Sequence, residues 1–118
     1  MSSTVWLRIE GLAVLLTSTL IYTHNGHSWL LFIILLFAPD ISIVGYLHNN
    51  RTGAILYNLF HTYSLPLLLG IAAFILGAPL LSALALIWSA HIGLDRSLGY
   101  GLKLPGGFKE THLGPILP

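Results

Sequence analysis

Five ionisable side chains that can bind a metal ion or move a proton stand inside otherwise apolar stretches of this sequence. They are one glutamate, two aspartates and two histidines: Glu10, Asp40, His61, His91 and Asp95. An ionisable side chain inside an apolar segment is costly, so each is a candidate functional residue. Imidazole and carboxylate without sulfur suit zinc, manganese or iron(II), and the sequence does not choose among these ions.

The spacing inside single segments favours a shared site. His91 and Asp95 are four residues apart, so on a helix they lie on one face and can hold one ion. Two prolines, Pro39 and Pro66, stand near other candidates and cannot donate a helical hydrogen bond to the carbonyl four residues earlier. We therefore expect bent helices that open polar backbone beside Asp40 and His61.

The composition places these residues in a membrane protein. The 118 residues are 55% hydrophobic and 8% charged, whereas an ordinary soluble domain is about 25% charged. The mean hydropathy is +0.82. So few charges cannot cover a soluble domain, which nearly excludes a cytosolic enzyme. A net charge of +1 without a basic run excludes nucleic-acid binding, and the absence of Cys excludes thiolate chemistry.

Four apolar stretches are long enough to cross a bilayer, since a helical span needs about 20 residues. They cover residues 5–23, 28–47, 52–76 and 79–102, with short polar or Gly/Pro turns between them. We expect an all-α, integral membrane four-helix bundle with up-down-up-down topology, a single domain over residues 1–118. Its tail, residues 103–118, should be irregular because it contains three Pro and three Gly.

Two further patterns concern assembly and orientation. Small residues recur every four positions along the fourth span and predict close helix packing, within the bundle or across a homodimer: Ser89, Gly93, Ser97 and Gly101. Basic residues flank only the positions that share one side of a four-span protein: Arg8, Arg51, Lys103 and Lys109. The positive-inside rule then puts both termini in the cytoplasm.

The spans bring the candidate ligands to one depth. Asp40 lies eight residues before His48 and Asp95 lies eight residues before Lys103, so each is roughly 12 Å in from the cytoplasmic side. His61 lies roughly 14 Å in. His91 is one turn deeper than Asp95, and Glu10 is shallower. We therefore predict that one pocket beneath the cytoplasmic headgroups holds a divalent metal.

The leading hypothesis is a membrane-embedded, metal-dependent enzyme, a hydrolase acting on a lipid or another amphiphile that enters from the cytoplasmic leaflet. Asp40, His61, His91 and Asp95 would bind the metal. Glu10 would be a general base or a further ligand, and Asn58 and Arg96 would orient the substrate.

Other interpretations stay open. A small homodimeric transporter or channel would use Glu10 for proton coupling. His61 and His91 could ligate haem, or the bundle could be a scaffold with a buried polar network. At single positions, His91 and Asp95 could form a plain structural hydrogen bond, Asp40 could cap a helix, and Glu10 could face water.

Five stretches spread over most of the chain form a recognisable pattern: residues 7–11 (LRIEG), 38–40 (APD), 57–63 (YNLFHTY), 91–103 (HIGLDRSLGYGLK) and 108–114 (FKETHLG). In these stretches the chain resembles an uncharacterised bacterial family of small membrane proteins. The resemblance implies a multi-pass protein of the bacterial inner (plasma) membrane. It implies no activity, because the family has no assigned function.

A looser similarity is to membrane-bound, metal-dependent hydrolases. Those proteins carry Pro-Asp, a His-rich stretch, His-x-x-x-Asp and a Tyr/Trp-Gly element in that order. Pro39-Asp40, His61-Thr62, His91 with Asp95, and Tyr100-Gly101 stand in the same order here. The middle stretch of this chain has one His where that group has more, which argues against a two-metal site.

Overall fold

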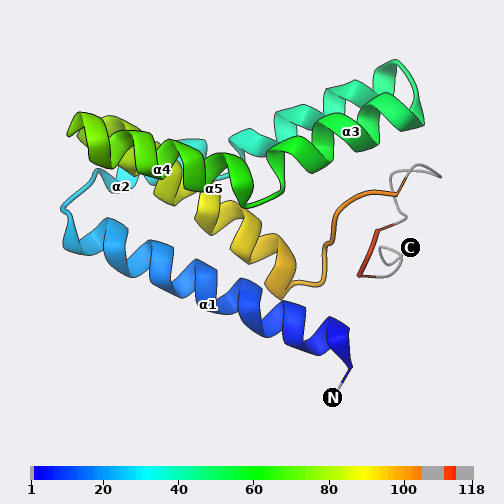
Figure 1. The fold of residues 1–118 in the computed structure, drawn as a ribbon, viewed down its shortest axis with the longest axis horizontal. Coiled ribbons are helices and arrows are strands. Elements are labelled where there is room, and N and C mark those ends of the chain that lie inside the picture. The colour runs from blue at the N-terminus through cyan, green and yellow to red at the C-terminus, as the bar shows by residue number, and fades with distance from the viewer. Residues whose placement is uncertain (1, 105–110, 114–118) are drawn as a thin grey trace.

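The computed structural model describes residues 2–104 and 111–113, and these form helices joined by short turns, with an isolated β-bridge and no β-strand. The elements in chain order are α1 (Ser3–His24), α2 (Trp29–Leu35), the 3₁₀ helix η1 (Ala38–Leu47), α3 (Asn50–Phe60), α4 (Ser64–Leu76) and α5 (Pro79–Ser97) (Figure 1). α2 continues into η1, and α3 into α4, so the described chain makes four helical rods. The predicted all-α fold is confirmed.

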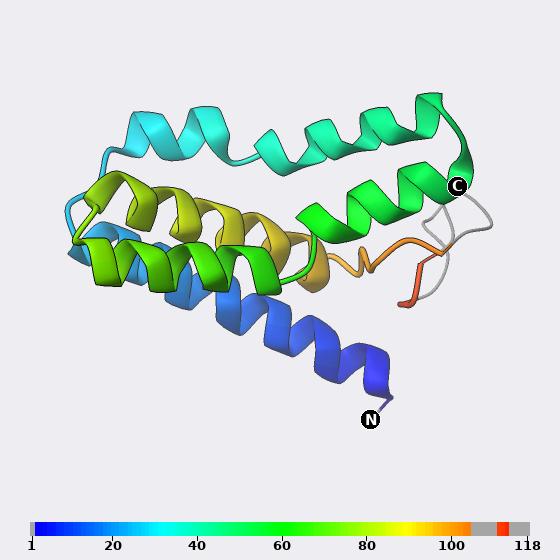
Figure 2. The same ribbon diagram turned by 45° about the horizontal axis from the view of Figure 1, so that its top comes forward.

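Successive rods run in opposite directions (Figure 2). The turns at residues 25–28 and 77–78 lie at one end of the molecule. The N-terminal end, the turn at residues 48–49 and the segment that follows α5 lie at the other. This second end of the molecule is therefore the one nearer to Arg8, Arg51 and the buried Lys103.

The first three rods match the predicted spans to within two residues at each boundary. Within the described residues, three rods are long and apolar enough to cross a membrane: Ser3–His24, Trp29–Leu47 and Asn50–Leu76. α5 is not one of them, because its last two turns carry His91, Asp95 and Arg96. Large apolar side chains such as Leu47 and Phe74 are highly exposed on the outside of the bundle, which suits a lipid environment.

The fourth rod corrects the prediction, because it ends at Ser97 and not at Leu102. The amide of Tyr100 donates to the Asp95 carbonyl at 2.8 Å, and Gly99 adopts a φ of 91°. These are the features of a glycine-terminated helix, in which a left-handed residue turns the chain away from the helix axis. Gly101 therefore lies beyond the helix that was expected to contain it.

Both bent rods break where the prolines predict. α2 ends at Leu35, four residues before Pro39, and α3 ends six residues before Pro66. The break in the third rod frees two carbonyl groups, and α5 supplies a donor to each. Trp88 Nε1 donates to the carbonyl of Phe60 at 2.7 Å, and an Arg96 amino group donates to that of His61 at 2.7 Å. The open backbone is thus bound by protein and not left in the apolar interior.

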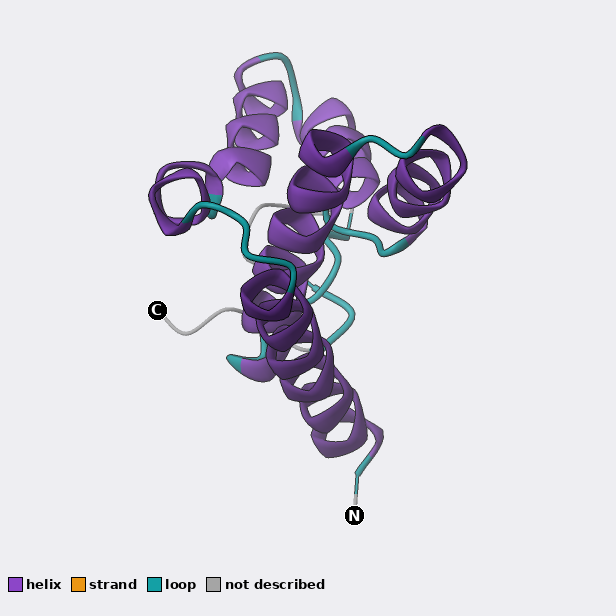
Figure 3. Ribbon diagram, turned by 90° about the vertical axis from the view of Figure 1, so that its left-hand side faces the viewer, coloured by secondary structure: helices purple, strands orange, loops and turns teal. Residues whose placement is uncertain are grey.

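α5 lies at the centre of the helices, between α1, α2 and α4 in the end-on view of Figure 3. A core of buried residues joins α1, α2 and α5: Tyr22, Phe32, Ala83, Ile87 and Ala90. Where α1 crosses α5, a Cβ on Gly93 would lie 2.7 Å from the Gly11 carbonyl oxygen. The small residue at 93 therefore serves packing within the chain, one of the two predicted alternatives.

Candidate metal centre

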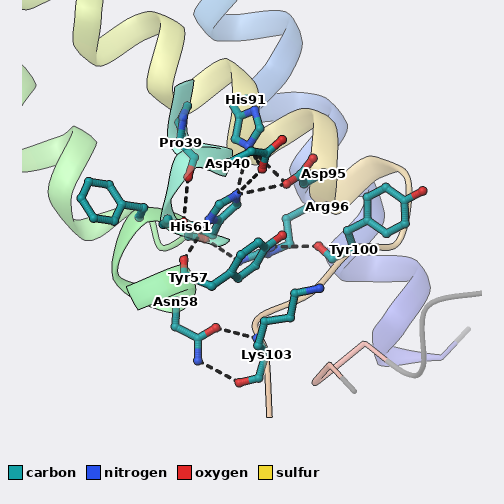
Figure 4. A network of polar contacts seen from close by, with 12 residues as sticks. Pro39, Asp40, Tyr57, Asn58, His61, His91, Asp95, Arg96, Tyr100 and Lys103 are labelled. Carbon is teal, nitrogen blue, oxygen red and sulfur yellow. Dashed lines mark hydrogen bonds and ion pairs between the residues drawn. The ribbon is translucent and has the colours of Figure 1, made fainter. Parts of the chain in front are cut away.

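Four of the predicted side chains converge on one point from three parts of the chain (Figure 4). Asp40 comes from η1, His61 from the break between α3 and α4, and His91 and Asp95 from successive turns of α5. Each residue offers one ligand atom, and these atoms all lie within 4.8 Å of one another. The predicted convergence of the four residues is therefore present in the structure.

Five of the six separations between the ligand atoms are close to those around a single tetrahedral ion. His61 Nε2 lies 3.0 Å from His91 Nε2, 3.0 Å from Asp40 Oδ1 and 3.5 Å from Asp95 Oδ2. His91 Nε2 lies 3.2 Å from Asp40 Oδ1 and 3.3 Å from Asp95 Oδ2. A tetrahedral ion with bonds of about 2.0–2.1 Å holds its ligand atoms about 3.3–3.4 Å apart. Five edges of such a tetrahedron are thus close to the required length.

With both imidazoles neutral, the protons on these groups do not satisfy every close contact in the arrangement. His61 Nδ1 lies 2.8 Å from the carbonyl oxygen of Tyr57, which can only accept, so Nδ1 carries the proton and neutral His61 presents an Nε2 lone pair to the cluster. The two carboxylates are acceptors as well. One N–H on His91 Nε2 cannot be shared among three acceptors at 3.0–3.3 Å. A cation at the centre would satisfy all four groups.

His61 is oriented by its own helix and by α5. Its ring stacks on Tyr57 with centroids 3.7 Å apart and an angle of 6° between the planes. Tyr57 precedes His61 by four residues, so one side chain supplies the ring contact and the same residue's carbonyl fixes Nδ1. Partners of this kind set the tautomer and direction of a metal-binding imidazole. His91 differs, because its buried Nδ1 has no hydrogen-bond partner among the described residues.

The cluster is reached from one side. The side chains of His61 and His91 are 0% exposed and that of Asp95 is 11% exposed, whereas that of Asp40 is 38% exposed. Water or a substrate would therefore reach the centre past Asp40.

The segment after α5 packs against the face of the site that Tyr57 covers. Asn58 donates to the Lys103 carbonyl at 2.8 Å and accepts from the Lys103 amide at 2.5 Å. This holds the Lys103 ammonium 4.6 Å from the centroid of the Tyr57 ring. Burial lowers the pKa of the Lys103 amine to about 8, although the charges of Asp95 and Asp40 act in the opposite direction.

The returning tail secures the segment that carries Lys103. Thr111 pairs with Lys103 in an antiparallel bridge, and the amide of Leu102 donates to His112 Nδ1 at 2.7 Å. Burial lowers the pKa of the His112 imidazole, and the nearby charge of Arg96 lowers it further. Most of the tail that was predicted to be irregular lies outside the described residues, but Thr111 and Leu113 are buried.

The other three predicted site residues lie elsewhere. Arg96 is buried and donates to the carbonyls of His61 and Tyr100, and Asn58 binds the backbone of Lys103. Both hold the frame of the site in this structure. Glu10 is exposed on α1 and is not a member of the four-residue cluster.

Sequence reasoning gave Tyr57 and Lys103 no role at the site. For Tyr57 the available signal was its position one helical turn before His61, which places the two rings on one face. Lys103 gave no such signal, because its contact with Tyr57 joins residues 46 positions apart.

The comparisons with known proteins agree with the resemblance found in the sequence. No curated protein and no solved structure matches the chain. The family model described as Domain of unknown function (DUF4260) matches residues 4–116, nearly the whole chain. The chain therefore belongs to the DUF4260 family.

Proposed function

We propose that this protein is a membrane-embedded, metal-dependent enzyme, a hydrolase whose substrate is a lipid or another amphiphile. The observation that carries the proposal is the convergence of Asp40, His61, His91 and Asp95 to within 4.8 Å inside an apolar helical protein. Buried acids without a counter-charge are strongly destabilising, and a divalent cation offsets that cost. An ion that keeps a coordination position open would also lower the pKa of a bound water, which would supply a nucleophile.

The coordination number decides how the site would work. A tetrahedral zinc ion would be filled by the four protein ligands, whereas manganese or iron(II) accepts further ligands. Asp40 is the ligand that solvent reaches, so its side is where a water or a substrate head would bind. The two buried histidines would keep the ion in place while Asp40 faces the reacting molecule.

We also propose an orientation of the protein in the membrane. Both termini would lie in the cytoplasm of a bacterial cell, with the site beneath the inner-leaflet headgroups. The supporting observation is that Arg8 and Arg51 lie toward the same end of the molecule as the start of the tail.

A haem held by both histidines fits the geometry poorly. An iron porphyrin would have to lie between the two Nε2 atoms, which are 3.0 Å apart. Two carboxylates, Asp40 and Asp95, also occupy the sides of that gap.

Metal content tests the proposal first. Wild-type protein purified in detergent should contain about one equivalent of zinc, manganese or iron, and His61→Ala and His91→Ala should each lose it. The matched control is His48→Ala, because His48 is exposed in the turn between η1 and α3. Equal metal content in the wild type and both site variants would refute the metal centre.

Activity is tested separately on the metal-loaded protein. Ester and phosphodiester amphiphiles should be cleaved by the wild type, and a chelator should stop cleavage until the metal is restored. Stoichiometric metal with no cleavage of either class would leave a structural ion site and would contradict the hydrolase assignment.

A further inference from the structure

An apolar cavity of about 300 Å³ lies among α2, η1, α3, α4 and α5. Its walls include the chain neighbours of two candidate metal ligands, since Pro39 precedes Asp40 and Phe60 precedes His61. Ile87 and Trp88, one turn before His91 on α5, also line it. The cavity thus adjoins the part of the chain that forms the metal centre.

The wall of the cavity is almost entirely apolar. The Trp88 indole N–H is used on the Phe60 carbonyl, and the Pro39 carbonyl accepts from the Ser42 hydroxyl at 2.7 Å. The other lining side chains are hydrocarbon, aliphatic except for the Phe60 ring. A polar ligand group placed here would lose its hydrogen bonds to water without replacement, so the cavity selects hydrocarbon.

The cavity also extends away from the ligands. Leu84 lines it and stands seven residues before His91, about 10 Å along α5. Leu69 of α4 forms part of the opposite wall. Asp40, the exposed ligand, directly follows two residues of the lining, Ala38 and Pro39. A molecule with its polar head at Asp40 can therefore place a chain along this wall.

We propose that this cavity binds the single hydrocarbon chain of an amphiphile whose polar head binds the ion beside Asp40. This assignment rests on the proposed metal centre and specifies its substrate class: a single-chain amphiphile with a metal-binding head. Leu84 and Leu69 then determine the chain length that fits.

The test uses Co²⁺-loaded protein in phosphatidylcholine nanodiscs and a series of alkyl hydroxamic acids from two to fourteen carbons. Binding of the head group is read from the visible spectrum of the Co²⁺ ion. Affinity should rise by about twofold per added CH₂, less than the roughly fourfold expected for transfer from water, because the bilayer competes for the chain. It should stop rising once the cavity is full.

Cavity-filling variants separate the cavity from the surrounding lipid. Leu84→Trp should weaken binding of the ten-carbon and longer probes by about tenfold and leave the two- to four-carbon probes unchanged. Leu69→Trp fills the same space from α4 and gives an independent variant. The control is Leu80→Trp, since Leu80 lies one turn earlier on α5, is exposed and does not line the cavity.

The outcomes are distinct. Loss of long-chain binding in the two cavity variants but not in Leu80→Trp supports the proposal. The same chain-length dependence in all four proteins would show that the chain stays in the bilayer, which overturns the cavity assignment and leaves the metal centre standing. Absence of a Co²⁺ spectrum in the wild type would overturn both.

Discussion

His61 is held by groups on several sides, whereas outside the cluster the His91 ring has an edge-on contact with Phe37. The Tyr57 ring stacks on the His61 imidazole, the Tyr57 carbonyl accepts from its Nδ1, and Arg96 binds its backbone carbonyl. The Nδ1 of His91 has no hydrogen-bond partner among the described residues. His61 is therefore the preorganised ligand around which an ion would assemble the other three.

Removing the ring that supports His61 should weaken metal binding without removing a ligand. Tyr57→Ala keeps the backbone acceptor but loses the stacking, so affinity for Zn²⁺ should fall by about tenfold, as for other outer partners of metal-binding histidines. Tyr57→Phe keeps the stacked ring and should remain near the wild type. The measurement is competition with a chelating dye in detergent, and equal affinities of the wild type and Tyr57→Ala would contradict it.

Lys103 should give the protein a pH-dependent stability. Its pKa is about 8 in the folded protein and 10.5 without the fold. The unfolded chain binds more protons between these values, so wild-type stability should increase from pH 8 to pH 10.5 relative to Lys103→Met. Below pH 8 the difference should be constant. Thermal unfolding in detergent measures this difference in stability. The same pH dependence of stability in both proteins would show that burial does not shift the pKa of the Lys103 amine.

At the scale of helices, an added Cβ is expected to have opposite effects on stability at two helical glycines, Gly93 and Gly70. A Cβ on Gly93 would lie 2.7 Å from backbone atoms of Gly11 and Leu15, whereas one on Gly70 would meet only the Ala85 Cβ at 3.8 Å. Backbone atoms of a packed helix cannot move away from an added Cβ by a change of rotamer, as a side chain can. The contact of α1 with α5 therefore depends on Gly93, and that of α4 with α5 does not depend on Gly70.

Gly93→Ala should accordingly destabilise the protein by about 1–3 kcal/mol, the usual cost of overpacking. Gly70→Ala should be neutral or stabilising by up to about 1 kcal/mol, since Ala favours the helix. Thermal or denaturant unfolding in the same detergent compares the two variants. Similar stability of the two variants would mean that α1 can shift on α5 without loss of stability.

For the whole molecule, the chain itself provides a clean test of orientation, because it contains no Cys. Ser3, Asn25 and His48 are exposed and lie at the start of α1, in the first turn and in the second turn. With cytoplasmic termini, Asn25→Cys should react with a membrane-impermeant maleimide on intact bacterial cells. Ser3→Cys and His48→Cys should react only after lysis. Labelling of His48→Cys in intact cells would invert the proposed orientation.

The sequence by itself determined the first three rods and the four side chains that meet in the cluster. Hydropathy and Gly/Pro turns place helix boundaries because these signals act within a few residues of the backbone they control. The ligands could be predicted because ionisable residues inside apolar segments are few, and their spacing along antiparallel helices fixes their depth. Asp40, His61, His91 and Asp95 follow from these two facts.

Only the tertiary structure decided the rotation of each helix and the partners of the long polar side chains. Gly11 faces Arg96 on α5, and its neighbour Glu10, turned by about 100°, therefore faces outward. Arg96 and Asn58 bind backbone groups that a helix break and a chain return expose. Such contacts join residues 35 and 45 positions apart. They depend on how whole helices pack, which residue spacing within one helix does not specify.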